Sequence, residues 1–81
     1  MDTDIKTIKA LADHRVEVVL ADGRAGVFDL RPYLDRPGMM ALKDPAYFRQ
    51  VQVLFGAATW PGGEDIAPAT LAAGMTALQA A

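Results

Sequence analysis

Cysteine, serine and asparagine are absent from this 81-residue chain, and histidine occurs once. Without cysteine the chain has no disulfide, and a single histidine leaves almost none of the His/Cys ligand sets that hold zinc. The chain also lacks Ser and Cys nucleophiles and, without asparagine, any N-glycosylation sequon. We therefore expect a protein that is not an enzyme, with no catalytic residue, no cofactor and no bound metal.

Neither sign of charge dominates the chain. Eight Lys and Arg residues stand against ten Asp and Glu residues, which gives a net charge of −2, and the two signs are interspersed along the sequence. Tight binding to nucleic acid usually needs a cluster of cations that displaces phosphate counterions. Because the sequence shows no such cluster, it argues against direct binding to nucleic acid.

The chain also lacks a long apolar run. Its first four residues are acidic and polar, unlike a secretory signal, and no segment approaches the roughly 18 apolar residues that a membrane-spanning helix needs. We expect a cytoplasmic protein that does not contact membranes. The length and the 52% hydrophobic content predict a single domain over residues 1–81, whose small core depends on packing alone or on a partner chain.

The first thirty residues predict a three-stranded antiparallel meander, with strands at 5–12, 15–20 and 24–29. Asp13-His14 is a polar break between the first two strands. Asp22-Gly23 is a strong hairpin signal and favours a two-residue turn between the second and third.

That two-residue turn fixes a register in which Leu20 faces Ala25 and Val18 faces Val27. The predicted core face then carries Val16, Val18, Leu20, Ala25 and Val27, joined by Ile5 and Leu11 if Asp13-His14 is also a two-residue turn. Phe28 falls on the opposite face, together with Ile8, Ala10, Glu17 and Val19. Because this second face is half apolar, we expect something to cover part of it.

Proline and aspartate predict two short helices after the meander. Pro32 suits the first turn of one helix, with Asp29 as its N-cap, and Asp44 followed by Pro45 opens another over residues 46–50. A second hairpin follows: Val51 to Phe55 alternates as a strand, Gly56-Ala57 forms the tip, and residues 58–60 return.

Residues 66–81 carry no charge, and Pro68 can open a helix there with an apolar stripe of Leu71, Met75 and Leu78. A helix of about 13 residues is marginal alone in water, so it should be docked or frayed. One interpretation is an Ala-rich helix or tail over residues 67–81 that packs on one side of the sheet. The other is that its second face is buried in a homodimer. The predicted fold class is therefore α+β: a small antiparallel sheet, made of the meander and a C-terminal hairpin, with short helices and a C-terminal helix.

Three sites invite functional hypotheses. His14 beside Asp13 could belong to a nucleophilic catalytic triad, but without Ser and Cys the nucleophile would have to be a threonine. A solvated histidine in a turn is the simpler interpretation. Glu64 and Asp65 are carboxylates able to bind a hard cation or to act in acid catalysis, but two adjacent carboxylates are a weak signal, and Asp65 as a cap or turn residue before the last helix is the better interpretation. Trp60 is either an exposed binding residue or a core residue whose indole N–H meets a backbone carbonyl.

Several motifs occur together in a specific order. They are Val18-Val19-Leu20-Ala21-Asp22-Gly23-Arg24, Val27-Phe28-Asp29-Leu30, Leu42-Lys43-Asp44-Pro45-Ala46-Tyr47-Phe48, and Thr59-Trp60-Pro61-Gly62-Gly63-Glu64-Asp65-Ile66-Ala67-Pro68 with Leu71. In combination they resemble the bacterial family called domain of unknown function 2442, over residues 5–71. One departure is Gly62, where the family commonly carries asparagine or another polar residue.

The resemblance implies a small α+β domain without established activity or catalytic residues. Family members are often encoded beside another short protein, which implies a partner from a neighbouring gene and a toxin–antitoxin-like pair. We therefore interpret the chain as a non-enzymatic protein-interaction module. The alternative is a nucleic-acid-associated transcriptional regulator acting through a complex. The candidate interaction residues are Trp60, Pro61, Gly63, Glu64, Asp65 and Phe28.

The homodimer hypothesis for the uncharged tail is tested by its mass in solution. If the second face of the tail is buried between two copies, gel filtration with light scattering at micromolar concentration should give twice the chain mass. A single monomeric species at every concentration would contradict it.

Overall fold

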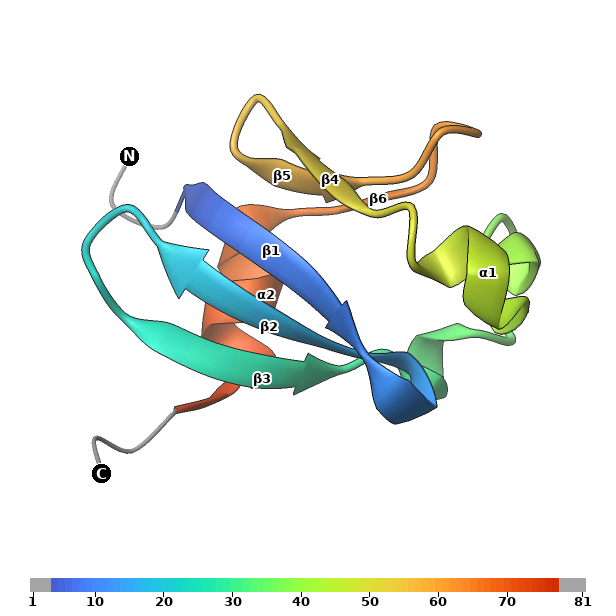
Figure 1. The fold of residues 1–81 in the computed structure, drawn as a ribbon, viewed down its shortest axis with the longest axis horizontal. Coiled ribbons are helices and arrows are strands. Elements are labelled where there is room, and N and C mark those ends of the chain that lie inside the picture. The colour runs from blue at the N-terminus through green and yellow to red at the C-terminus, as the bar shows by residue number, and fades with distance from the viewer. Residues whose placement is uncertain (1–3, 78–81) are drawn as a thin grey trace.

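A computed structural model describes residues 4–77 as two small antiparallel sheets joined by short helices (Figure 1). The first sheet has the order β1-β2-β3-β7 and the second the order β4-β5-β6. The strands are β1 (Ile5–Leu11), β2 (Arg15–Leu20), β3 (Ala25–Asp29), β4 (Gln52–Leu54), β5 (Ala57–Thr59), β6 (Asp65–Ile66) and β7 (Thr76–Ala77). The α-helices are α1 (Pro45–Phe48) and α2 (Pro68–Gly74), and the 3-10 helices are η1 (Ala12–His14), η2 (Arg31–Tyr33) and η3 (Met40–Lys43). The predicted α+β class, with an N-terminal meander and a later hairpin, is confirmed.

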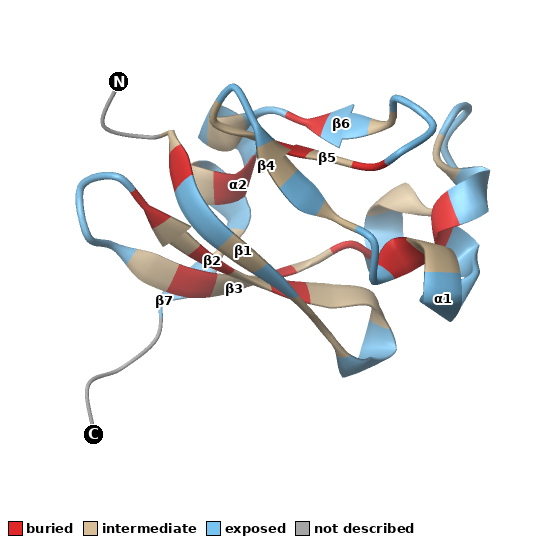
Figure 2. Cartoon of the chain, turned by 45° about the horizontal axis from the view of Figure 1, so that its top comes forward, coloured by how far each residue is buried: buried red, intermediate tan, exposed pale blue. Residues whose placement is uncertain are grey.

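One hydrophobic core joins both sheets and the helices. Figure 2 shows its buried residues on strands of both sheets, on α1 and on α2. The first sheet supplies Val16, Val18, Leu20 and Phe28, the second supplies Ala58 and Ile66, and α2 supplies Leu71, which is fully buried. In Figure 1, α2 lies behind β1 to β3, so it covers one face of the first sheet.

The register between β2 and β3 differs by one residue from the predicted one. Val19 pairs with Ala25, Val18 with Gly26 and Val16 with Phe28. The cause is the turn, which has three residues instead of two: Gly23 donates its N–H to the Leu20 carbonyl (2.9 Å) and Leu20 donates to the Arg24 carbonyl (2.8 Å). Gly23 has φ +94°, so the loop is a β-turn closed by a glycine bulge.

A one-residue shift moves every side chain of the third strand to the other face. Phe28, predicted on the second face, is 2% exposed and packs in the core. Ala25 and Val27, predicted in the core, are half-buried on the opposite face with Glu17 and Val19. The helix that packs on this sheet lies on the Phe28 side, so the second face remains half-exposed.

The same correction applies to the β1–β2 connection. It contains the three residues of η1, so Leu11 pairs with Arg15 and Ala10 with Val16. Ile8, predicted on the second face, pairs with Val18 and packs against the core with Ala10. The register shifts between Ile5 and Thr7, and this bulge lets Ile5 also reach the core, where it is 4% exposed.

The start of α1 follows the predicted local signal: the Asp44 carboxylate accepts the Ala46 N–H (3.0 Å) and Pro45 opens the helix, whose Phe48 is buried. At η2 the N-cap residue is Leu30 and not the predicted Asp29, but the Asp29 carboxylate still accepts the Arg31 N–H (2.9 Å). Both aspartates satisfy a backbone donor that the short helix leaves without an internal partner.

The tip of the second hairpin lies one residue earlier than predicted. Leu54 pairs with Ala57, and the two residues between them are Phe55 and Gly56. Their φ values are +51° and +77°, as a type I′ turn requires. Phe55 is thus a turn residue and not the last residue of the strand.

The C-terminal segment departs most from expectation. Asp65, predicted as a helix cap or turn residue, lies in β6 opposite Thr59. The helix opens at Pro68 as predicted but ends at Gly74; Met75 is extended, and Thr76 and Ala77 pair with β3. Glycine disfavours helix, and pairing with the sheet edge replaces further helical turns. Leu78, the last residue of the predicted stripe, lies outside the described residues.

The register predicts that truncating two neighbouring residues of β3 destabilises the fold to very different extents. Phe28→Ala should lower the free energy of unfolding by about 3–5 kcal/mol, because it opens a cavity in the core. Val27→Ala should cost less than about 1 kcal/mol, since Val27 is half-exposed. Urea denaturation followed by circular dichroism measures both values. If Val27→Ala lost more unfolding free energy than Phe28→Ala, the result would favour the register of a two-residue turn and contradict the observed one.

Candidate functional site

The segment from Trp60 to Asp65 forms the β5–β6 turn. Gly63 donates to the Trp60 carbonyl and Trp60 to the Glu64 carbonyl, both at 2.9 Å, and Gly63 has φ +98°. This is the same three-residue loop as the one between β2 and β3. Pro61 occupies the first central position, which suits its fixed φ. Pro61 and Gly63 therefore have structural roles, and both are exposed at the surface of the turn.

Trp60 itself belongs to the core. Its side chain is 1% exposed, and its indole N–H donates to the Phe48 carbonyl at 2.9 Å. Its ring also packs against Phe48, with ring centroids 6.0 Å apart. This is the structural interpretation of Trp60, and it leaves the indole no surface to present to a partner.

Tyr47 connects α1 to the β5–β6 turn. Its hydroxyl donates to a Glu64 carboxylate oxygen and accepts the Gly62 N–H, each at 2.6 Å. A Cβ at position 62 would lie 2.6 Å from the Tyr47 hydroxyl oxygen, so glycine makes room for this bridge. The hydrogen bond to the Glu64 carboxylate raises the pKa of Tyr47 above its ordinary value.

The two adjacent acids do not form one site. Glu64 binds Tyr47, whereas Asp65 is exposed on β6, and successive residues of an extended segment point to opposite sides. Within residues 4–77, no group of three or more His, Cys, Asp and Glu side chains is placed to hold a metal ion.

Three basic residues have nearby carboxylate partners. Arg24 pairs with Asp22, Arg31 with Asp29 and Lys43 with Asp35, each at 2.7 Å. Hydrogen bonds from the Arg31 side chain and N–H lower the pKa of Asp29. The Arg24 N–H is the largest cause of the lowered pKa of Asp22, and the Lys43 ammonium lowers the pKa of Asp35. These pairs spread the charges of both signs over the surface.

The family model for "Protein of unknown function (DUF2442)" matches residues 5–77. The chain belongs to the DUF2442 family. The match extends past Leu71, where the sequence resemblance was expected to stop, and includes α2 and β7. No curated protein and no solved structure matches the chain.

The DUF2442 motifs thus map onto turns, caps and core contacts. Asp44 caps α1, Trp60 fixes the second sheet to α1, Gly63 closes a turn and Pro68 opens α2. The helices described within residues 4–77 lack the length and the apolar run that a membrane span requires.

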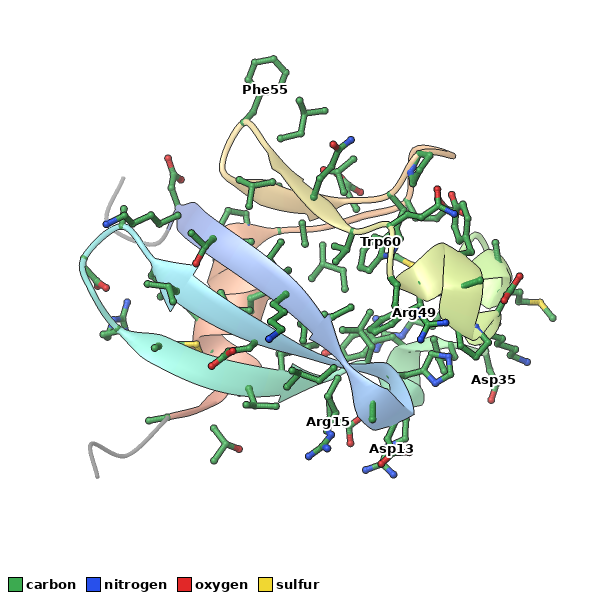
Figure 3. The ribbon with its side chains drawn as sticks, viewed as in Figure 1. Asp13, Arg15, Asp35, Arg49, Phe55 and Trp60 are labelled. Atoms are coloured by element: carbon green, nitrogen blue, oxygen red, sulfur yellow. The ribbon has the colours of Figure 1, made fainter. Side chains whose placement is uncertain are left out.

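The most exposed large hydrophobic residue within residues 4–77 of this DUF2442 chain was not predicted from the sequence. Phe55 is 96% exposed at the tip of the β4–β5 hairpin, next to Leu54 at 47% (Figure 3). Alternation with Val51 and Val53 assigned Phe55 to a strand. A type I′ turn favours glycine in the second position of a two-residue loop. Phe55-Gly56 meets this preference and Gly56-Ala57 does not, so this comparison would have placed Phe55 at the tip.

His14 is held more firmly than a solvated turn residue. Its Nε2 lies 3.1 Å from the Lys43 carbonyl, and its ring centroid is 5.0 Å from that of Phe48. A carbonyl only accepts, so Nε2 donates. Both His14 and the preceding Asp13 have positive φ, at +58° and +63°.

The hydrogen bonds of Tyr47 predict that its hydroxyl ionises at a higher pH than an ordinary tyrosine. Because folding raises the pKa of Tyr47, the bridge stabilises the fold below the ordinary tyrosine pKa of about 10, and this contribution is lost as pH rises through the higher folded value. Ultraviolet titration should show a tyrosinate transition above pH 10 that disappears in Tyr47→Phe. Glu64→Ala, which removes both the acceptor and the charge, should move it down. An unchanged transition in Glu64→Ala would contradict the assigned cause.

Proposed function

We propose that this DUF2442 protein is a non-enzymatic protein-interaction module that inserts the β4–β5 tip into an apolar pocket of its partner. The observation that carries the proposal is the 96% exposure of Phe55, flanked by Leu54. Aromatic residues are enriched at protein interfaces, and a few such residues carry most of the binding energy.

The conformation of Phe55 supports this role. A bulky residue at φ +51° costs about 1–2 kcal/mol relative to one in an ordinary region, and an exposed side chain gains no burial in return. Asn-Gly is the preferred pair for this turn type, so phenylalanine is a poor choice for the fold alone. A binding role explains why an aromatic ring stands there.

The tip is also held in place. The Ile5 N–H donates to the Gly56 carbonyl at 2.9 Å, and a Cβ at Gly56 would lie 2.8 Å from the Asp4 carboxyl carbon. The start of β1 therefore packs directly against the turn. A rigid aromatic side chain loses little conformational entropy on binding, which favours affinity.

The partner that suits this surface is another protein, encoded in a neighbouring gene, in a toxin–antitoxin-like pair. Non-enzymatic action is supported by the structural roles of Trp60, Gly63 and Glu64. The alternative, a regulator that contacts nucleic acid through a complex, has less support, because Arg24, Arg31 and Lys43 are paired with carboxylates. The partner that receives the β4–β5 tip could also be a second copy of this chain. The mass of the complex distinguishes a homodimer from a complex with another protein.

The conflict between stability and binding at Phe55 gives a sharp test. Phe55→Asn should raise the free energy of unfolding by about 1 kcal/mol, because asparagine tolerates positive φ. The same change should weaken binding to the purified neighbouring gene product by at least about 30-fold, the loss of one strong interface residue. Thermal denaturation and isothermal titration calorimetry measure the two effects.

Met40→Gln is the matched control, since Met40 is another exposed large apolar residue, in η3. Its removal should leave binding unchanged. The proposal fails if Phe55→Asn and Met40→Gln bind like the unmodified chain, or if the neighbouring product does not bind the unmodified chain at all.

A further inference from the structure

A pocket of about 370 Å³ lies between the β1–β2 connection and α1, away from the β4–β5 tip. Its volume is within the range of about 300–1,000 Å³ that small ligands occupy. The side nearest β1 is formed by Ala10, Leu11, Ala12, Asp13 and His14, and the opposite side by Pro45, Phe48 and Arg49. Most of these side chains are apolar, and Asp13, His14 and Arg49 are the polar ones among them.

The two walls are fixed relative to each other. The His14 ring packs on Phe48 and its Nε2 hydrogen-bonds the Lys43 carbonyl, which directly precedes Asp44 and the start of α1. The Leu30 N–H donates to the His14 carbonyl at 2.9 Å. The positive φ values of Asp13 and His14 turn the connection toward α1, and such conformations concentrate at binding sites.

Arg49 is the cation of this pocket. It is exposed at the end of α1, and in Figure 3 it lies between α1 and the β1–β2 connection. Its guanidinium has no ion pair or side-chain hydrogen bond among the described residues, in contrast to Arg24 and Arg31. A guanidinium beside apolar side chains is suited to a carboxylate, which it binds through two parallel hydrogen bonds.

Asp13 is the acid among the residues that line the pocket, and it forms no ion pair or hydrogen bond with Arg49 in the described part of the chain. The donors of the Arg49 guanidinium are therefore available to a carboxylate from outside the pocket walls.

We propose that this pocket binds a carboxylate attached to an aliphatic or aromatic group. Arg49 pairs with the carboxylate, and Leu11 and the exposed Pro45 contact the apolar group. A free organic acid and the C-terminal residue of a peptide share this chemistry. The site does not involve Phe55, so its test is independent of the proposed protein-binding role.

The test is a nuclear magnetic resonance titration of the full chain with isocaproate. We expect the amide signals of the pocket residues to shift with a millimolar dissociation constant, and isocaproamide, which lacks the charge, to bind at least tenfold more weakly. Arg49→Gln should weaken isocaproate binding at least tenfold. Arg36→Gln removes the same charge from a guanidinium that lies over the Tyr33 ring at 4.3 Å, outside the pocket, and should leave binding unchanged.

Two further arms complete the test. Asp13→Asn keeps a residue that tolerates positive φ and removes the nearby negative charge, so it should strengthen binding two- to threefold. The second arm uses an acetylated peptide that ends in leucine. If this peptide binds more tightly than isocaproate and loses binding when its C-terminus is amidated, the site exists and its ligand is a chain end. If isocaproate binds and the peptide does not, the site exists and its ligand is a free acid. Equal binding of acid and amide, no loss in Arg49→Gln, or no shift at pocket signals would overturn the proposal.

Discussion

The hydrogen bond from the Trp60 indole to the Phe48 carbonyl is the contact on which the arrangement of the two sheets depends. α1 is a single turn and the second sheet has strands of only two and three residues, so neither is stable alone. Trp60 joins them inside the core, where an unpaired indole N–H would itself be costly. The Phe48 ring contacts both the Trp60 ring and the His14 ring. These aromatic contacts thus link the second sheet through α1 to the β1–β2 connection.

These contacts also explain why the family motifs carry no visible chemistry. Trp60, Gly63 and Asp44 are required for the packing of short elements that hydrophobic burial alone would hold weakly in a domain of this size. Tyr47 reinforces the same connection from outside by bridging Glu64 and the Gly62 N–H. The two surfaces that we propose for binding, the β4–β5 tip and the pocket next to α1, lie next to these motifs.

The sequence predicted the elements well and their faces poorly, for one physical reason. Hairpin signals such as Asp22-Gly23 locate a turn, but a two-residue and a three-residue loop share them, and the choice reverses which side of each strand faces the core. Phe28 was misplaced for this reason, and Phe55 was misplaced by a one-residue shift of the second tip. Local caps such as Asp44 were predictable because their partners lie two residues away. The pocket was not, because it joins His14 and Arg49 from distant segments whose approach only the core decides.

The three non-glycine residues with positive φ among residues 4–77 are Asp13, His14 and Phe55. For a bulky residue such as Phe55 this conformation costs about 1–2 kcal/mol, a large fraction of the stability that a domain of this size has, whereas Asp and His adopt it more readily. Where the fold alone needs such a conformation, as at positions 23 and 63, the chain uses glycine. Asp13 and His14 border the pocket and Phe55 forms the exposed tip. The three positive-φ residues therefore lie at the proposed binding tip and beside the proposed ligand pocket, and at Phe55 no burial within the fold offsets the strain.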